Sequence, residues 1–352
     1  MQTNQQLLYW GLADVGTNNF IPGSQARANF PYNGIDFPQS RPTGRFSNGF
    51  NSADVLAKVM GYKKSSPPFL SLVNSSSCLT NNSIKGINFA SGEAGILDIT
   101  GQSILRASLL SYCPQLTLMK FGKENTPSSS KNQKNVISLA VQILQFARVQ
   151  NDLMGTMGQA AMKKFLFKSL FFISIGSNDI FAYYYSNSSL SKQDFMSNLV
   201  LTYENHLKDL LNLGARKFGI ISVPPIGCCP SHRIYTATGG CLEELNDQAR
   251  AFHATGMKYS LRNTFEMTLS VIEDPLSFTK QFAPREIFHS FIHFNAESIC
   301  DPKENLCLNH KDHLFWDLFH PIQAASEFAA IILYGGPPRF IAPLNFFQLT
   351  NA

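Results

Sequence analysis

The sequence lacks both the long apolar run and the concentrated charge that several classes of protein require. Its longest apolar stretches, at 169–175 and 328–334, are far shorter than the roughly 18–20 residues of a membrane-spanning helix. The chain has 29 Lys and Arg against 24 Asp and Glu, a net charge of +5, and no block of five or six basic residues. A membrane span and a concentrated nucleic-acid-binding surface are therefore excluded.

The sequence also predicts neither a phosphate-binding loop nor a secretory signal peptide. There is no GxxxxGK[ST] and no GxGxxG in a strand-to-helix setting, which excludes the common nucleotide loops. Residues 1–10 have no basic start and too short an apolar stretch for a secretory signal peptide. Asn-x-Ser sequons at Asn74, Asn81 and Asn187 nevertheless suggest an exported protein.

The seven cysteines are few but partly clustered. Cys228, Cys229 and Cys241 lie near Gly and Pro residues, and Cys300 and Cys307 form a second group. Such spacing favours local disulfide bonds over buried free thiols. The odd number leaves at least one thiol unpaired within the chain.

Apolar residues make up 44% of the chain, enough for a large core. Strands are predicted at 86–90, 169–175 and 218–223, and helices at 135–152, 199–210 and 243–253. The two longer strands are apolar without alternation, which indicates burial on both faces. The order of elements predicts βαβ crossovers in an α/β fold with a parallel sheet, as one domain over residues 1–352.

In such sheets, functional groups gather in the loops after the carboxyl ends of the strands. These loops are expected at 91–95, 176–179 and 224–229. Gly92 offers a backbone N–H there, and Asn178 offers a side-chain amide. Either both groups stabilise a developing oxyanion, or both loops are simply tight turns.

The segment FWDLFHP at 315–321 places Asp317 three residues before His320. This spacing can direct a carboxylate at one imidazole nitrogen and leave the other as a general base. The alternative is a surface turn with an incidental histidine. Cys307, His310 and His313 are nearby, but the spacings match no common zinc pattern, so no metal or cofactor is predicted.

Seven blocks, taken together, resemble a known family. They are DVGTNN (14–19), ARANFPYNGIDFP (26–38), PTGRFSNG (42–49), NFASGEAGI (88–96), IGSNDI (175–180), NLGARKFGIISVPPIGCCP (212–230) and FWDLFHP (315–321). In this order they are similar to the plant GDSL esterase/lipase family of the SGNH hydrolase superfamily. The resemblance extends from about residue 12 to the C-terminus.

The resemblance implies a three-layer α/β/α sandwich with a flavodoxin-like sheet, and hydrolysis of small-molecule or lipid carboxylic esters by a serine mechanism. His320 would be the general base, oriented by Asp317, while Gly92 and Asn178 would bind the oxyanion. The family needs no metal or organic cofactor, and its members are usually exported. We also expect a monomer.

Two segments, 1–11 and 279–294, depart from the family pattern. The family's Gly-Asp-Ser-Leu block should precede Asp14, but aligning Leu12–Gly16 puts Gly11 at the nucleophile position. The first strand is therefore also expected to be incomplete. The second segment lacks a Cys-Cys-Gly element, so the resemblance implies that Cys300 pairs with Cys307 and that Cys78 or Cys113 lacks a partner.

Loss of the serine from a triad hydrolase costs on the order of 10⁶ in kcat. One hypothesis attributes both atypical segments to altered exon choice or a faulty gene model. A second is that the chain is an inactive relative that binds esters, glycans or a protein partner. A third is rescue by Ser91 or Ser177, and a fourth is a cytosolic α/β protein without ester chemistry, in which all cysteines are free.

Overall fold

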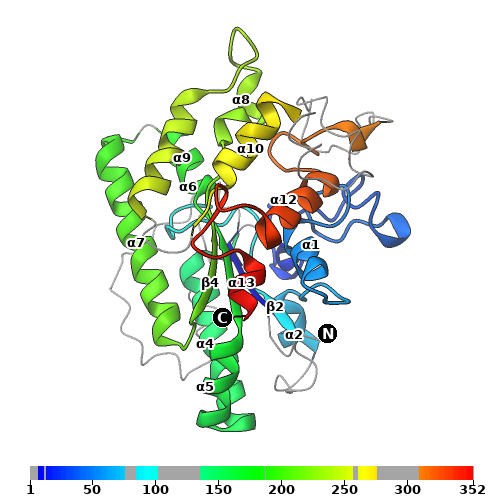
Figure 1. Cartoon of the computed structure of the whole chain (residues 1–352), viewed down its shortest axis with the longest axis vertical. Coiled ribbons are helices and arrows are strands. Elements are labelled where there is room, and N and C mark those ends of the chain that lie inside the picture. Colours follow the sequence, from blue (N-terminus) through cyan, green and yellow to red (C-terminus); the bar gives the residue numbers. More distant parts are fainter. Residues whose placement is uncertain are drawn as a thin grey trace.

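The computed structural model describes residues 7–11, 13–75, 85–101, 135–186, 188–256, 261–275 and 309–351. A central sheet lies between two groups of helices, with α7, α9 and α4 on one side and α1 and α12 on the other (Figure 1). Across these ranges, none of the helices combines the length and the apolar character needed to cross a bilayer.

Within the described residues, six strands form one sheet of order β2-β1-β3-β4-β5-β6. They are β1 (Leu7–Gly11), β2 (Gly86–Asn88), β3 (Leu170–Ser174), β4 (Lys217–Ile221), β5 (Leu261–Arg262) and β6 (Ile341–Ala342). All neighbours are parallel except β5 and β6. The order of the first five strands is the flavodoxin-like one, so the predicted fold class is confirmed.

The described helices connect and cover these strands. They are η1 (Thr17–Phe20), η2 (Pro38–Ser40), α1 (Ser52–Val59), α2 (Phe69–Ser75), α4 (Leu139–Met157), α5 (Gln159–Lys168), α6 (Ser177–Tyr185), α7 (Lys192–Asn212), η4 (Ile226–Cys228), α8 (Pro230–Arg233), α9 (Glu243–Gly256), α10 (Thr264–Glu273), η6 (His310–Asp312), α12 (Gln323–Gly335) and α13 (Phe346–Asn351). The helices predicted at 135–152, 199–210 and 243–253 correspond to α4, α7 and α9.

The strands bury side chains on both faces, as their continuous apolar runs predicted. Phe171 and Ile173 of β3 pack with α4 and α7, whereas Leu170 and Phe172 pack with α1, α12 and α13. Successive side chains of a strand point to opposite faces. One apolar strand therefore supplies both cores, and the result is a three-layer α/β/α sandwich.

The expectation of an incomplete first strand is wrong. β1 has five residues, as do β3 and β4, and it pairs with β3 from Leu7 to Gly11. Leu7, Leu8 and Tyr9 are each at most 3% exposed. Because these three side chains fill both cores, a short apolar segment suffices to build the strand.

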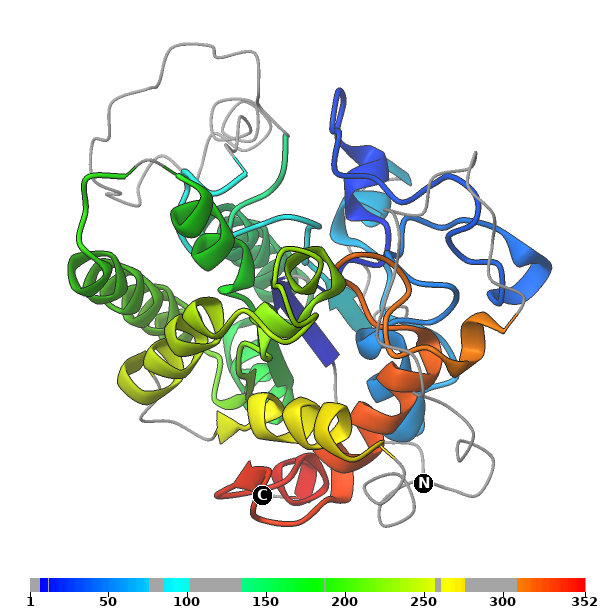
Figure 2. The same cartoon turned by 90° about the horizontal axis from the view of Figure 1, so that it is seen from above.

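Residues 309–323 lie beside the segment of residues 13–50 (Figure 2). Asn48 Oδ1 accepts from the backbone N–H of Gln323 at 2.7 Å, and Trp316 Nε1 donates to Asn33 Oδ1 at 2.9 Å. These contacts join two ends of the sequence that helix and strand patterns do not connect.

Among the clustered cysteines, Cys228 and Cys241 form a disulfide bond, while Cys229 is a buried free thiol. This bond confirms the local pairing expected there and contradicts the hypothesis that all cysteines are free. The expected Cys300–Cys307 pair lies outside the described residues. So do Cys78, Cys113, Asn81, Asn187 and the atypical segment 279–294.

We predict that Phe171→Ala lowers the free energy of unfolding by about 3–5 kcal/mol, because it removes a fully buried ring from the main core. Phe167→Ala is the matched control: this ring is 58% exposed, and its loss should cost under about 0.5 kcal/mol. Urea unfolding measures both values, and equal losses would contradict this assignment of the core.

Candidate active site

A tight turn brings Asp317 and His320 together. Phe315 and Pro321 form an antiparallel bridge across its base, and the N–H of Trp316 donates to the His320 carbonyl at 2.7 Å. Asp317 Oδ1 also accepts from the backbone N–H of His320 at 2.7 Å. The same carboxylate therefore fixes the turn and faces the ring.

The imidazole of His320 is oriented by that carboxylate. Its Nδ1 lies 3.0 Å from Asp317 Oδ1 and 2.9 Å from Oδ2. A carboxylate at this nitrogen favours the tautomer with the proton on Nδ1, which leaves Nε2 as an acceptor. Among the described residues nothing hydrogen-bonds to Nε2, and the His320 side chain is 39% exposed. The pair therefore presents a basic nitrogen to solvent.

The charge state of His320 depends on opposing influences. Burial disfavours the imidazolium, but the carboxylates of Asp317 and, more weakly, Glu93 favour it, so the pKa of His320 is raised above its ordinary value. The ring can act as a base only in its neutral form. Its action as a base thus increases with pH through that elevated pKa.

Phe46 connects the imidazole to the loop after β2. Its ring stacks on His320 with centroids 4.8 Å apart. A Cβ at position 92 would lie 2.7 Å from Phe46 Cε2, so only glycine fits there without a shift of the ring. Gly92 and His320 therefore both lie next to the ring of Phe46.

The two candidate oxyanion donors both lie at the 91–95 loop, but each already has a partner inside the protein. The N–H of Gly92 donates to Asp14 Oδ2 at 3.2 Å. Asn178 Nδ2 donates to the carbonyl of Ala94 at 3.0 Å. An amide nitrogen has a second hydrogen, so Asn178 keeps one donor. The single N–H of Gly92 must exchange Asp14 for a ligand before it can bind an oxyanion.

Asp14 was not identified as a site residue from the sequence. Its carboxylate also accepts from the N–H groups of Gly16 at 2.8 Å and Thr17 at 2.6 Å. Burial raises the pKa of Asp14, although these bonds and that from Gly92 limit the rise. In the sequence, Asp14 followed by Val15-Gly16-Thr17 indicates a local turn. No sequence pattern indicates that the same carboxylate binds the N–H of Gly92.

Position 11, the expected place of the nucleophile, is closed to any side chain. Gly11 has φ +95°, and a Cβ there would lie 2.0 Å from the carbonyl oxygen of Ser174. Its N–H donates to Gln142 Oε1 at 2.9 Å, and its carbonyl accepts from the N–H of Ser91 at 3.0 Å. The backbone is thus held on both sides in a conformation that suits glycine.

The serines proposed as substitutes do not reach the base. Ser91 is fully buried, and its Oγ donates to Asn18 Oδ1 at 2.5 Å and accepts from the N–H of Ile137 at 3.1 Å. Ser177 begins α6. Neither hydroxyl bonds to His320 in the described part of the chain.

An aromatic cluster adjoins the Asp317–His320 turn. Phe319 packs edge-on against Phe181 of α6, with centroids 5.7 Å apart. The buried ring of His232 stacks on Phe181, with centroids 5.0 Å apart, and on Tyr185, with centroids 5.9 Å apart. Asn178 belongs to the same helix as Phe181. These contacts place α6 and the turn next to each other and form an apolar wall beside His320.

Asp179 braces the 91–100 loop, a role the sequence did not reveal. Its carboxylate accepts from the N–H groups of Ile96 at 2.9 Å and Leu97 at 3.0 Å, and from Thr100 Oγ1 at 2.7 Å. Burial raises the pKa of Asp179 to about 6, against the lowering effect of these bonds. The loop that carries Gly92 is therefore anchored beside Asn178.

A flavodoxin-like sheet with a carboxylate–imidazole pair near the ends of its strands defines an α/β protein of the SGNH hydrolase type. The chain belongs to the GDSL-like lipase/acylhydrolase family, whose model matches residues 15–333.

Two relatives from Arabidopsis thaliana illustrate the match. One GDSL esterase/lipase is 29% identical over 341 residues, covering 92% of this chain and 86% of the relative. GDSL esterase/lipase 7 is 30% identical over 369 residues, covering 97% and 90%. Among solved structures, a carbohydrate esterase gives 12% identity and a TM-score of 0.28, over 73% of this chain and 54% of that one. Family membership rests on the sequence matches.

We predict that Asp317→Asn lowers the pKa of His320 below its ordinary value, because burial then outweighs the remaining attraction to Glu93. Titration of the ring proton signals by NMR measures the shift. Asp36→Asn, which removes the carboxylate bonded to His310, is the control and should leave His320 unchanged. An unaltered pKa in Asp317→Asn would contradict the pairing.

We also predict a pH-dependent stability from Asp179. Its folded-state pKa of about 6 exceeds the ordinary value near 3.9, so the folded state binds this proton more tightly. The resulting stabilisation is full below about pH 4 and is lost as the pH rises through about 6. Urea unfolding should show that wild type gains about 1–3 kcal/mol relative to Asp179→Asn between pH 7 and pH 4. Parallel pH curves would contradict this.

Proposed function

We propose that this protein binds carboxylic esters beside His320 and hydrolyses them slowly, through a water molecule that His320 activates. The observation that carries the proposal is the Asp317–His320 pair, with the His320 side chain 39% exposed and no partner for Nε2 among the described residues, in a chain of an esterase/lipase family. The base is kept, whereas the residue that forms the covalent intermediate is missing.

In the proposed reaction His320 carries its proton on Nδ1, so Nε2 is the atom that acts as the base. Nε2 of His320 takes a proton from water, and the oxygen of that water adds to the ester carbonyl carbon. The tetrahedral intermediate then expels the alkoxide, which receives the proton from the imidazolium, and the products are an acid and an alcohol. Asn178 supplies one N–H to the oxyanion, and Gly92 a second once it releases Asp14.

Substrates are proposed to be small-molecule or lipid esters whose apolar part lies along the wall of Phe181, Phe319 and Tyr185. Tyr185 is 60% exposed and stacks on the same His232 ring as Phe181, so an acyl or aryl group can cover it. The Cys228–Cys241 disulfide supports an extracellular location.

A second candidate is a binding protein without turnover. It is favoured by the internal partners of Gly92 and Asn178, which leave fewer donors ready for a transition state. In this case esters are held beside His320 and released unchanged.

The structure also suggests how the nucleophile was lost. Gly11 adopts a conformation that only glycine tolerates, directly at the end of β1. We infer that Gly11 corresponds to the glycine of the family's Gly-Asp-Ser-Leu block, and that two residues, Asp and Ser, are missing between Gly11 and Leu12. A substitution at position 11 would then be the wrong repair.

We predict that inserting Asp-Ser between Gly11 and Leu12 raises kcat/KM for p-nitrophenyl butyrate on the order of 10³-fold or more, because it restores covalent catalysis. Gly11→Ser, the matched single substitution, should give no gain and should destabilise the fold, since its Cβ would meet Ser174. Steady-state assays and urea unfolding measure both effects. Activity in Gly11→Ser but not in the insertion variant would overturn the proposed register.

His320→Ala separates the two candidate functions. If the unmodified chain hydrolyses the ester and His320→Ala loses that turnover, the protein is a slow hydrolase. If both give the same background rate while ester binding persists, it is a binding protein.

A further inference from the structure

Three strongly exposed hydrophobic side chains lie together beside the candidate active site. Tyr235 is 78% exposed, Ile234 63% and Tyr185 60%. Among the described residues these are three of the four most exposed large hydrophobic side chains, the other being Ile99. Together they form the apolar rim. Exposed hydrophobic side chains that gather in one place are typical of an interaction surface.

The apolar rim is continuous with the apolar wall beside His320. The ring of Tyr185 stacks on that of His232, which contacts Phe319 with centroids 6.0 Å apart. Phe319 in turn contacts the His320 ring with centroids 6.4 Å apart. Burial and then the neighbouring phenols, that of Tyr235 among them, raise the pKa of Tyr185, so the two rim tyrosines are close. An ester held beside His320 therefore has the rim next to its apolar part.

The loop between α8 and α9 carries Ile234 and Tyr235, and it projects from the top of the molecule (Figure 1). The Cys228–Cys241 disulfide bond closes the base of this loop. A cross-linked loop has less freedom to lose when it binds a partner. The disulfide bond therefore helps to present both side chains in advance.

Polar groups of this loop bond within the loop itself. Arg233 Nε donates to the carbonyl of Gly239 at 2.8 Å. Thr236 Oγ1 lies 2.9 Å from the carbonyl oxygens of Arg233 and Gly240. A polar group that already has a hydrogen-bond partner costs less to remove from water. These contacts therefore lower the cost of placing the loop against an apolar surface.

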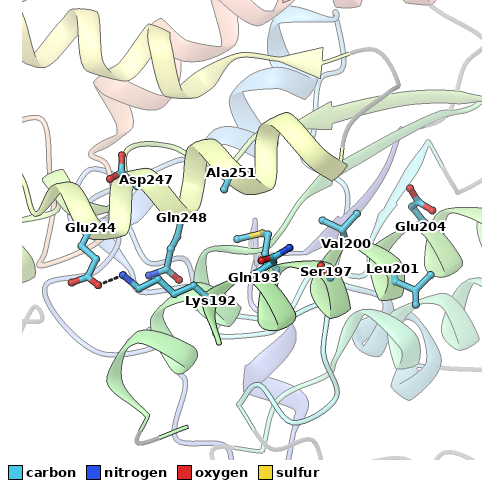
Figure 3. Close-up of a pocket in the computed structure, with 11 residues that line it drawn as sticks. Lys192, Gln193, Ser197, Val200, Leu201, Glu204, Glu244, Asp247, Gln248 and Ala251 are labelled. Carbon is cyan, nitrogen blue, oxygen red and sulfur yellow. Dashed lines mark hydrogen bonds and ion pairs between the residues drawn. The ribbon is translucent and has the colours of Figure 1, made fainter. Parts of the chain in front are cut away.

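The rim and its surroundings offer little charge to a partner. The sequence has no charged residue at 180–191 or at 234–242. The charged residues that follow these two segments form the ion pairs Lys192–Glu244 (Figure 3) and Arg250–Glu243. Paired charges attract a charged surface only weakly. The rim therefore suits an uncharged surface better than an anionic or cationic one.

We propose that the apolar rim docks on an uncharged lipid surface. Ile234 and Tyr235 enter its apolar layer, while the tyrosine hydroxyl groups stay at the polar boundary, the position that tyrosine favours at such interfaces. The lipid then lies next to the wall that leads to His320. The choice of lipid as the partner rests on the proposed hydrolysis of lipid esters, whereas docking itself requires no turnover.

Cosedimentation with phosphatidylcholine vesicles tests this docking. Ile234→Ser/Tyr235→Ser should lower the partition of the protein onto the vesicles at least about 10-fold, because two apolar side chains no longer leave water on docking. Phe167→Ser/Leu201→Ser is the matched control. It replaces side chains that are 58% and 57% exposed outside the rim, and it should leave the partition unchanged. Equal losses in the two double variants, or no binding by wild type, would overturn the proposal.

Adsorption by charge must be distinguished from docking, because the chain has a net charge of +5. Binding to phosphatidylcholine should persist at about 0.5 M NaCl, where interactions between exposed charges are screened. Binding that requires phosphatidylserine in the vesicles and is lost in this salt would contradict an uncharged docking surface.

A second copy of the chain is the other candidate occupant of the rim. Sedimentation velocity of wild type and Ile234→Ser/Tyr235→Ser distinguishes the two occupants. A wild-type dimer that the double variant dissociates, without binding of either protein to vesicles, would assign the rim to self-association and overturn the proposal. Both substituted side chains are exposed, so urea unfolding should show the same stability for the two proteins.

Turnover of p-nitrophenyl acetate, a water-soluble ester, separates this inference from the proposed function. Ile234→Ser/Tyr235→Ser should match wild type in this assay while its vesicle binding falls. Hydrolysis of the soluble ester without vesicle binding by wild type would overturn the docking alone. Vesicle binding without hydrolysis would support the docking and contradict only the proposed hydrolysis.

Discussion

The carboxylate of Asp317 is the interaction on which the candidate active site depends. Asp317 is 1% exposed. Its carboxylate accepts a hydrogen bond from the backbone N–H of His320, which closes the 315–321 turn, and both of its oxygens lie within 3.0 Å of His320 Nδ1. The same carboxylate therefore shapes the turn, selects the tautomer of His320 and favours its protonated form. Because α12 begins two residues after Pro321, this anchored turn also sets the start of a helix that packs on the sheet.

Close approach of neighbouring atoms to two glycines is the second constraint on the candidate site. Gly11 and Gly92 each lie where a Cβ would collide, the first with the Ser174 carbonyl and the second with the Phe46 ring. At Gly11 the backbone of Ser174 fills the space that a side chain would need, and at Gly92 the ring of Phe46 fills it. A side chain at position 11 would therefore collide with the backbone of Ser174, so this position does not accommodate a catalytic hydroxyl without a shift of the chain.

Local sequence patterns predicted individual elements well, but they did not predict contacts between residues far apart in the sequence. The apolar run at 169–175 identified β3, and the spacing of Asp317 and His320 indicated a contact that the turn makes. β1 was underestimated because its apolar core is only Leu7–Tyr9, and its stability comes from pairing with a strand more than 160 positions later. The partner of the Gly92 N–H lies 78 positions away. No local sequence pattern connects these residues. The fold class could therefore be predicted from the sequence, but the internal hydrogen-bond partners of the candidate oxyanion donors could not.

Buried polar groups distinguish what the fold needs from what a ligand must supply. Asp179 is buried, yet all its bonds run to the loop it braces, so its role is complete without a ligand. The carboxylate of Asp14 likewise accepts hydrogen bonds from backbone N–H groups, one of which is the candidate oxyanion donor of Gly92. A substrate of the proposed ester site must therefore displace an internal hydrogen bond, the one from the Gly92 N–H to Asp14, before that N–H can bind its oxyanion.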